Sequence, residues 1–512
     1  MTSDPILPGF YPDPTICRVG EDFYLANSSF EYFPGAPLWH SRDLVRWRQV
    51  GHVLDRRSQF DRGAGRPSSG LYAGTLRHHD GHFWYVTTNM GGAEGQLLVS
   101  SDNPAGPWSE PVVISAAIGI DPDLAWDDAG DCFLTWKAMS PTAGEVGILQ
   151  SGLDTHTGEL LDAPHPVWQG SGLAGAEGPH LYYIQGYWYL LLAEGGTERG
   201  HAVTIARGPH STGPFESCPD NPILSHRSTF DPVQNTGHAD LVQTATGEWA
   251  AVYLGARPRG CTPGFHVLGR ETFLAGVQWR DGWPVIDVDR YHVSHVETAF
   301  SEDFSGTELD QRWVVPGGDS ATTVQRDSEP GILVRPPLPD GDGQASVLCT
   351  RVRDLRWLAE ATVDGSGGFL VRMDHRHYYG LVRRAGAIEV VARIGDLETV
   401  VANMPVPPGP VDLRIEAVDP TLPPVPSFDA GPDDIVLSLV QSGAAHELAR
   451  LDGRYLSTEV AGGFTGRVLA LCATTEPLRV RSLRYRPTRD EALARPSDQT
   501  GTTPMSNPRE EE

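Results

Sequence analysis

The chain has 512 residues, enough for more than one domain, and its 39% hydrophobic and 21% charged residues are typical of a globular protein. The formal net charge of -26 argues against a nucleic-acid or anionic-membrane partner and favours a neutral ligand. The six cysteines show no C-x-x-C spacing, which argues against a zinc site, and no segment is long and apolar enough for a transmembrane helix.

The N-terminal segment, MTSDPILPGF, has neither the basic region nor the apolar core of a signal peptide, so we expect a cytoplasmic protein. In PGFYPDPT (8–15), Asp13 lies between Pro12 and Pro14. Proline fixes its own φ and pushes the preceding residue towards extended conformations. We therefore expect Asp13 in a stiff, extended segment that aims its side chain. The alternative is an ordinary turn, where Asp and Pro are common.

Five later stretches resemble one another, because each has a glycine-containing turn followed by an aromatic-rich strand. Their spacing of roughly 50–60 residues, with no helical period between them, predicts an all-β fold of propeller blades. The stretches are 19–29, 79–89, 128–138, 184–195 and 245–255.

A polar or aromatic signal precedes each of these strands by about a dozen residues. In a propeller, the innermost strand of every blade lines the central channel, so these signals are expected to meet around one axis. They are Asp13, the segment YAGT (72–75), Asp121, Glu177 and His238.

Asp13, Asp121 and Glu177 lie beside proline or glycine in apolar, aromatic surroundings. Cleavage of a glycosidic bond needs one carboxyl group that gives a proton to the leaving oxygen and a second that activates water or attacks directly. The acid must stay protonated near neutral pH, and a third carboxylate can supply the charge that keeps it so. Taken alone, an Asp before Pro is usually a turn residue, and a Glu beside Gly is usually a solvated loop residue.

A boundary is predicted near residues 297–305, and the region 300–487 alternates apolar and polar residues as in a two-sheet antiparallel sandwich. The proline-rich segment 419–434 predicts a long surface loop, and the polar residues 488–512 predict a disordered tail. The predicted domains are therefore 1–297, 300–487 and the tail.

Several long motifs, read in order, resemble glycoside hydrolase family 43 in its β-xylosidase-like branch. This resemblance implies a five-bladed β-propeller followed by a β-sandwich of the jelly-roll or concanavalin-like kind. In relatives the sandwich closes one end of the cleft, which implies a pocket that accepts a chain end. The motifs are residues 8–47, 119–134, 176–208, 235–258 and 268–285.

The resemblance also implies roles for the three carboxyl groups. Asp13 matches the general base, Glu177 the general acid, and Asp121 the carboxylate that orients the acid and tunes its pKa. The family inverts configuration, so Asp13 and Glu177 are expected about 6.5–9.5 Å apart, with room for water between them.

Four further residues match groups that line the subsite for the non-reducing end: Phe30, Tyr72, His238 and Arg270. Core packing is the alternative for Phe30, and a structural ion pair is the alternative for Arg270. His238 is a candidate substrate contact, a structural histidine or a ligand for the central calcium of some relatives. Many relatives carry Trp-Ala-Pro where this chain has Tyr72-Ala73-Gly74. No cofactor is required, and a structural calcium stays open.

Two other segments are candidates for the pocket rim. One is the Arg- and Gly-rich loop 55–70, and the other contains Phe464 in the second region. The loop is equally typical of a solvated surface.

The resulting hypothesis is an inverting exo-glycosidase that releases β-D-xylose from xylo-oligosaccharides or from oligosaccharides derived from arabinoxylan. The nearest rival is an α-L-arabinofuranosidase, or a bifunctional enzyme, that uses the same carboxylates. Two further hypotheses are a retaining glycosidase, with carboxyl groups about 5–5.5 Å apart, and a non-catalytic carbohydrate-binding propeller. A homo-oligomer is compatible with the sequence.

Overall fold

The computed structural model describes residues 4–60, 66–92, 94–140, 144–294, 296–317, 320–337, 346–421 and 428–488. Parts of the predicted loops 55–70 and 419–434, and all but the first residue of the predicted tail 488–512, lie outside these ranges. Among the described residues, no helix is long and apolar enough to cross a membrane.

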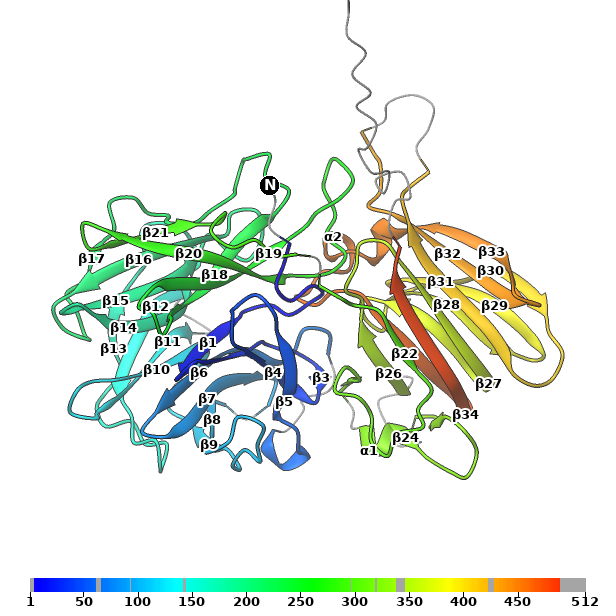
Figure 1. Cartoon of the computed structure of the whole chain (residues 1–512), viewed down its shortest axis with the longest axis horizontal. Coiled ribbons are helices and arrows are strands. Elements are labelled where there is room, and N and C mark those ends of the chain that lie inside the picture. Colours follow the sequence, from blue (N-terminus) through cyan, green and yellow to red (C-terminus); the bar gives the residue numbers. More distant parts are fainter. Residues whose placement is uncertain are drawn as a thin grey trace, which may run out of the picture.

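The N-terminal part of the chain forms five four-stranded antiparallel sheets among its described residues, and the sheets are arranged as the blades of a propeller (Figure 1). The first strand of each blade is innermost, because these strands contact one another from blade to blade. The blades are β1 Thr15–Val19, β2 Asp22–Ala26, β4 Gly35–Ser41 and β5 Arg48–Leu54; β6 Gly70–His79, β7 His82–Met90, β8 Gln96–Ser101 and β9 Val112–Ile114; β10 Gly119–Trp126, β11 Cys132–Ser140, β12 Gly144–Gly152 and β13 His165–Trp168; β14 Glu177–Ile184, β15 Tyr187–Glu194, β16 Ala202–Gly208 and β17 Glu216–Ser217; β18 Gln234–Gln243, β19 Trp249–Ala256, β20 Glu271–Arg280 and β21 Trp283–Asp287.

The C-terminal part is a sandwich whose two long strands, β27 and β34, belong to both layers. The first half of β27 pairs with β31, its second half pairs with β28, and the register shifts between them near Gly365. The elements are β22 Phe300–Glu302, α1 Ser320–Thr323, β24 Val324–Gln325, β25 Ile332–Val334, β26 Ser346–Arg351, β27 Trp357–Arg372, β28 His377–Arg384, β29 Ala387–Ile394, β30 Leu397–Pro405, β31 Val411–Val418, β32 Asp434–Gln441, β33 Ala444–Asp452, the 3-10 helix η2 Gly453–Leu456, α2 Thr458–Ala461 and β34 Val468–Pro487.

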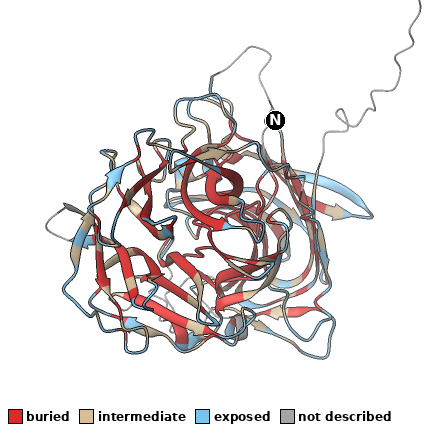
Figure 2. Cartoon of the chain, turned by 60° about the vertical axis from the view of Figure 1, so that its left-hand side comes forward, coloured by how far each residue is buried: buried red, intermediate tan, exposed pale blue. Residues whose placement is uncertain are grey.

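The hydrophobic cores lie between neighbouring blades and between the layers of the sandwich. Buried residues accordingly dominate the strands, and exposed residues lie mostly in the outer loops and in the edge strands (Figure 2). Five of the six cysteines are buried, as expected for small apolar residues.

The two halves are joined by backbone pairing and by side chains. Strand β3 (Tyr32–Phe33) of the propeller pairs with β23 (Val315–Pro316). Arg351 donates to the carbonyl oxygen of Phe10, and the His266 ring lies 2.7 Å from the Glu459 carboxylate of α2. These contacts hold α2 and the loop that follows it over the propeller (Figure 1).

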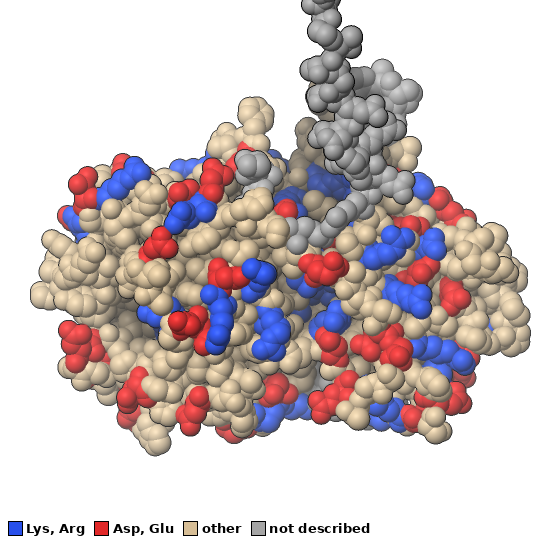
Figure 3. Space-filling model, in the orientation of Figure 1, with Lys and Arg blue, Asp and Glu red and all other residues tan. Residues whose placement is uncertain are grey.

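The charged side chains are not segregated by sign on the visible face. Acidic and basic residues are interspersed there on both halves of the molecule (Figure 3). This mixed surface, with the net charge of -26, gives a polyanion no extended basic track on that face.

Candidate active site

All seven residues predicted to line a site meet in one small cavity at the end of the propeller axis. Its volume is about 70 Å³. Inner strands or the loops beside them supply most of the lining, and the sandwich supplies Phe464. The lining residues are Asp13, Phe30, Tyr72, Ala73, Ile120, Asp121, Glu177, Thr197, His238, Arg270 and Phe464.

The inner strands of four blades are interrupted at the same level, and these interruptions turn side chains into the channel. The pairing register shifts next to Tyr72 in β6, Asp121 in β10, Glu177 in β14 and His238 in β18. Such β-bulges re-aim side chains and are common beside active sites. Four of the five predicted signals are therefore residues at the bulges, and Asp13 lies just before β1.

Backbone strain gathers at the same level. Asp13, Phe30, Asp121 and His238 have φ values of 51°, 51°, 56° and 46°, in the left-handed region that residues with a Cβ rarely adopt. Strain of this kind persists where the surrounding structure fixes the residue, and it clusters at functional sites.

The prediction of an extended backbone at Asp13 was wrong. The influence of Pro14 on the preceding residue is outweighed by contacts that hold the segment from both sides. The Asn27 side-chain amide donates to the carbonyl oxygens of Tyr11 and Pro12, and the Ser28 hydroxyl donates to the Asp13 carboxylate. These contacts, and not an extended backbone, hold the Asp13 segment in this conformation.

The Asp13 carboxylate is buried and ionised beside cationic and polar neighbours. Arg270 donates to its Oδ1 at 2.8 Å, and the His238 ring lies 3.9 Å away. Burial by itself would raise the pKa of Asp13, but Arg270, His238 and the Ser28 hydrogen bond together hold it below its usual value. Asp13 can therefore act as a base over a wide pH range.

Arg270 also shapes the cavity. It donates to the Thr197 hydroxyl at 2.9 Å, and its guanidinium lies 5.7 Å from the Phe30 ring and 5.4 Å from the Phe464 ring. Its buried Nε has no hydrogen-bond partner within the described ranges. A buried donor without a partner is costly, and a sugar hydroxyl is a suitable acceptor.

Asp121 and Glu177 form the opposite wall. The backbone N–H of Gly178 donates to Asp121 Oδ2 at 3.1 Å, and the Lys137 ammonium lies 2.9 Å from Glu177 Oε2. Burial first, and then the nearby charge of Glu177, raise the pKa of Asp121 well above its usual value. The two carboxyl groups are thus electrostatically coupled.

Three aromatic rings form the remaining wall. Phe30 stacks on Phe464 at 5.6 Å and meets Tyr72 edge-on at 5.4 Å. Gly74 is required here, because a Cβ at this position would lie 2.5 Å from the Tyr85 hydroxyl.

Two histidines flank the cavity, and both are neutral by environment. Burial lowers the pKa of His238 and lowers that of His201 to about 4. The His238 ring also packs against Gly178, where an added Cβ would lie 2.9 Å from its Cε1. His238 therefore lies between the Asp13 and Glu177 walls.

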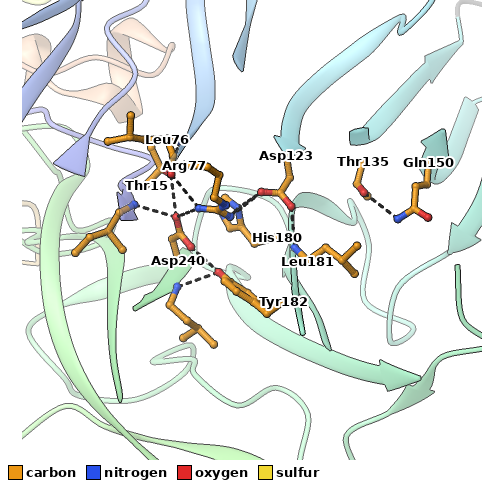
Figure 4. A network of polar contacts seen from close by, with 12 residues as sticks. Thr15, Leu76, Arg77, Asp123, Thr135, Gln150, His180, Leu181, Tyr182 and Asp240 are labelled. Carbon is orange, nitrogen blue, oxygen red and sulfur yellow. Dashed lines mark hydrogen bonds and ion pairs between the residues drawn. The ribbon is translucent and has the colours of Figure 1, made fainter. Parts of the chain in front are cut away.

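The acidic residues described around the axis do not form a calcium site, and a calcium ligated by His238 stays a prediction. Across the ranges given above, no group of three His, Cys, Asp or Glu side chains is placed to hold a metal. The buried Asp123 and Asp240 on the axis are already paired with Arg77, at 2.6 Å and 2.8 Å (Figure 4). Arg77 supplies the positive charge there, and we derive no step through a metal.

Sequence reasoning missed Thr197, Ser28 and Lys137. Thr197 lies in a loop, Ser28 has no motif of its own, and Lys137 is on β11, the second strand of its blade. None of them occupies the repeated position that marks the inner strands, so no periodic signal identified them.

A five-bladed propeller with a cluster of three acids, closed by a sandwich domain, defines a class of glycoside hydrolases. The comparisons agree: residues 2–284 match the model of glycosyl hydrolases family 43, and residues 301–481 match the beta xylosidase C-terminal concanavalin A-like domain. The chain belongs to glycosyl hydrolases family 43.

Three relatives show how far the similarity extends. A non-reducing end alpha-L-arabinofuranosidase of Bacteroides ovatus is 35% identical over 92% of this chain and 91% of its own. A xylosidase/arabinosidase of Butyrivibrio fibrisolvens is 40% identical over 69% of this chain and 72% of its own. The crystal structure of xylan beta-1,4-xylosidase from Bacillus halodurans is 27% identical, with a TM-score of 0.83 over 95% of this chain and all of that one.

Proposed function

We propose that this protein is an inverting exo-glycosidase that releases β-D-xylose from the non-reducing end of xylo-oligosaccharides or arabinoxylan-derived oligosaccharides. The observation that carries the proposal is the meeting of Asp13, Asp121 and Glu177 in one small cavity. The similarity to xylosidases and arabinosidases supports the substrate class.

The environments of the carboxyl groups support a distinct role for each. Asp13, ionised beside Arg270, takes a proton from the attacking water. Glu177 gives its proton to the glycosidic oxygen as the bond to the anomeric carbon breaks. Asp121 orients this acid through the Gly178 N–H. The water oxygen joins the anomeric carbon from the face opposite the leaving group, which inverts its configuration.

The walls of the cavity support removal of a terminal sugar. Phe30, Tyr72 and Phe464 offer apolar faces for a sugar ring, and Arg270 and His238 offer polar groups for its hydroxyls. Phe464 of the sandwich lines the cavity and stacks on Phe30, which supports a pocket that accepts a chain end. Cleavage is therefore exo.

The second candidate is an α-L-arabinofuranosidase, alone or together with the xylosidase activity. It is favoured by the Bacteroides ovatus relative, whose similarity extends over 92% of this chain. The same carboxylates would serve both reactions, and discrimination between the two sugars would depend on a few hydroxyl contacts worth about 1–3 kcal/mol each.

The test is hydrolysis of 4-nitrophenyl β-D-xylopyranoside beside 4-nitrophenyl α-L-arabinofuranoside. Faster turnover of the xyloside supports the first proposal, and faster turnover of the arabinoside supports the second. The Glu177→Gln variant is the control, and it should lose far more activity on oligosaccharides than on the aryl substrate, whose leaving group needs little protonation. An enzyme inert towards both aryl substrates, xylobiose and arabino-oligosaccharides would refute both.

A further inference from the structure

Lys137 makes a direct contact with the proposed general acid without lining the cavity. It lies on β11, opposite Ile120 of the inner strand β10, and its ammonium is 2.9 Å from Glu177 Oε2. The side chains of both residues are part-exposed, at 18% and 19%. An effect of Lys137 on the reaction would therefore pass through Glu177.

This residue is the only lysine in the chain. Of the 40 lysine and arginine residues, all the others are arginines. Two buried carboxylates elsewhere are paired with arginines that take both oxygens: Arg257 donates to Oε1 and Oε2 of Glu271, and Arg467 donates to Oδ1 and Oδ2 of Asp433. Arg270 and Arg77, in contrast, each contact a single oxygen of their partners. At Glu177 a different cation, with a different geometry, is used.

The difference matters because Glu177 must carry a proton. An ammonium is a point charge that can bind one carboxylate oxygen, whereas a guanidinium fork matches both. With Lys137 on Oε2, the donated proton has to be on Oε1 of Glu177. An arginine fork that occupied both oxygens at this position, as at Glu271 and Asp433, would leave no site for that proton.

The distribution of charges around the cavity also supports a role for Lys137. Among the ion pairs of the described residues, Asp13 has Arg270 and Glu177 has Lys137, while Asp121 has no cation within 4 Å. When Glu177 gives up its proton it becomes a carboxylate, and the ammonium already in contact stabilises that charge without reorganisation.

We propose that Lys137 is a positioning residue for the general acid: it confines the transferable proton to Oε1 of Glu177 and stabilises the carboxylate that remains after transfer. The inference rests on the proposed function. In the reaction, the proton moves from Oε1 to the leaving oxygen, the glycosidic bond breaks, and the proton from water ends on Asp13. Lys137 keeps its own protons throughout.

The test compares Lys137→Arg with Lys137→Met, using the pentoside that the parent cleaves faster. Each variant is assayed on the aryl glycoside and on the corresponding disaccharide. We expect kcat/KM on the disaccharide to fall about tenfold or more in both variants, with a smaller loss on the aryl glycoside, because only the disaccharide needs full proton transfer.

A merely structural ion pair predicts a different result, since arginine would replace lysine as well here as it serves elsewhere in the chain. Parent-like kcat/KM of Lys137→Arg on the disaccharide, with an unchanged melting temperature, would overturn the proposal. The Glu177→Gln variant separates this failure from failure of the proposed function. An equal loss of Glu177→Gln on both substrates would remove Glu177 from the acid role, and the Lys137 proposal with it.

The single lysine also gives a readout that does not depend on turnover. Biosynthetic labelling with [ε-13C]lysine places one labelled side chain in the protein, and its NMR shift reports on its ion-pair partner. We expect that shift to change over the pH range of the alkaline limb of kcat/KM and to lose this change in Glu177→Gln. A shift in the parent that stays constant until lysine itself titrates would overturn the proposal.

Discussion

Replacing Arg270 with methionine should raise the pKa of the proposed base and so weaken its ionisation at working pH. Arg270 is 2.8 Å from Asp13 Oδ1, and both side chains are more than nine-tenths buried. In the parent, burial raises the pKa of Asp13, but Arg270, together with His238 and Ser28, outweighs it. Without the guanidinium, burial is opposed only by the weaker contacts.

The size of the effect follows from the loss of one close, opposite charge. Such a neighbour lowers the pKa of a carboxyl group by about 1–3 units, and each unit corresponds to about 1.4 kcal/mol. A base works only when ionised, so a raised pKa of Asp13 moves the acid limb of kcat/KM to higher pH by about 1–3 units. The plateau should also fall, because Arg270 is a proposed contact for sugar hydroxyls.

The assay is the pH profile of kcat/KM on the preferred aryl pentoside, with melting temperatures to show that the variant is folded. Arg42→Met is the matched control, since Arg42 pairs with Asp22 on the surface and its side chain is 70% exposed. The control should keep the parent profile. If Arg270→Met lowers the plateau and leaves the acid limb in place, Arg270 is only a substrate contact and does not set the ionisation of Asp13.

Three other perturbations test the surroundings of the site. Phe464→Ala removes the ring stacked on Phe30 and should lower kcat/KM about tenfold, mainly by raising KM, with little change in melting temperature. An unchanged KM would show that Phe464 of the sandwich does not contribute to sugar binding. Arg77→Met leaves the buried carboxylates of Asp123 and Asp240 without their arginine, and it should lower the free energy of unfolding by about 3–5 kcal/mol in urea titrations. The control Arg42→Met removes an exposed ion pair and should change the free energy of unfolding little. Treatment with EDTA should leave the rate and the melting temperature unchanged, and a loss restored by added calcium would contradict the assignment of the axial charge to Arg77.

The architecture could be predicted from the sequence because it depends on local, repeated signals. A turn followed by an aromatic strand recurs once per blade, and Asp121, Glu177 and His238 occur at the same point of three such repeats. Repetition converts positions far apart in the chain into neighbours around an axis. The gathering of the proposed catalytic carboxylates therefore follows from the sequence without knowledge of any contact.

Contacts outside that repeat could not be predicted. Phe464 reaches the cavity from another part of the fold, through a loop that packs against Ser68 with a hydrogen bond from its backbone N–H. Lys137 reaches Glu177 across a blade boundary. The left-handed backbone of Asp13 depends on the amide of Asn27 and on Arg270, which follows it by 257 residues. Local preferences contain no information on any of these contacts.

The inner strands carry two layers of polar side chains around the axis. The difference in charge between these layers explains why the proposed chemistry is confined to one of them. Below the cavity, Asp123 and Asp240 are neutralised by Arg77, and the Tyr182 hydroxyl also donates to Asp240 at 2.5 Å (Figure 4). Arg77 and its neighbours hold the pKa of Asp240 at about 2, so this layer keeps its charges at working pH.

Two residues earlier on the same two strands, β10 and β18, Asp121 and His238 lie in the layer that lines the cavity. Here the ion pairs leave Asp121 without a cation of its own, and its pKa is raised well above the usual value. A fixed, neutralised layer thus supports a layer that holds Asp121 beside the proposed general acid, Glu177. A general acid needs such a fixed support, because its proton must be transferable while its carboxyl group must stay in position.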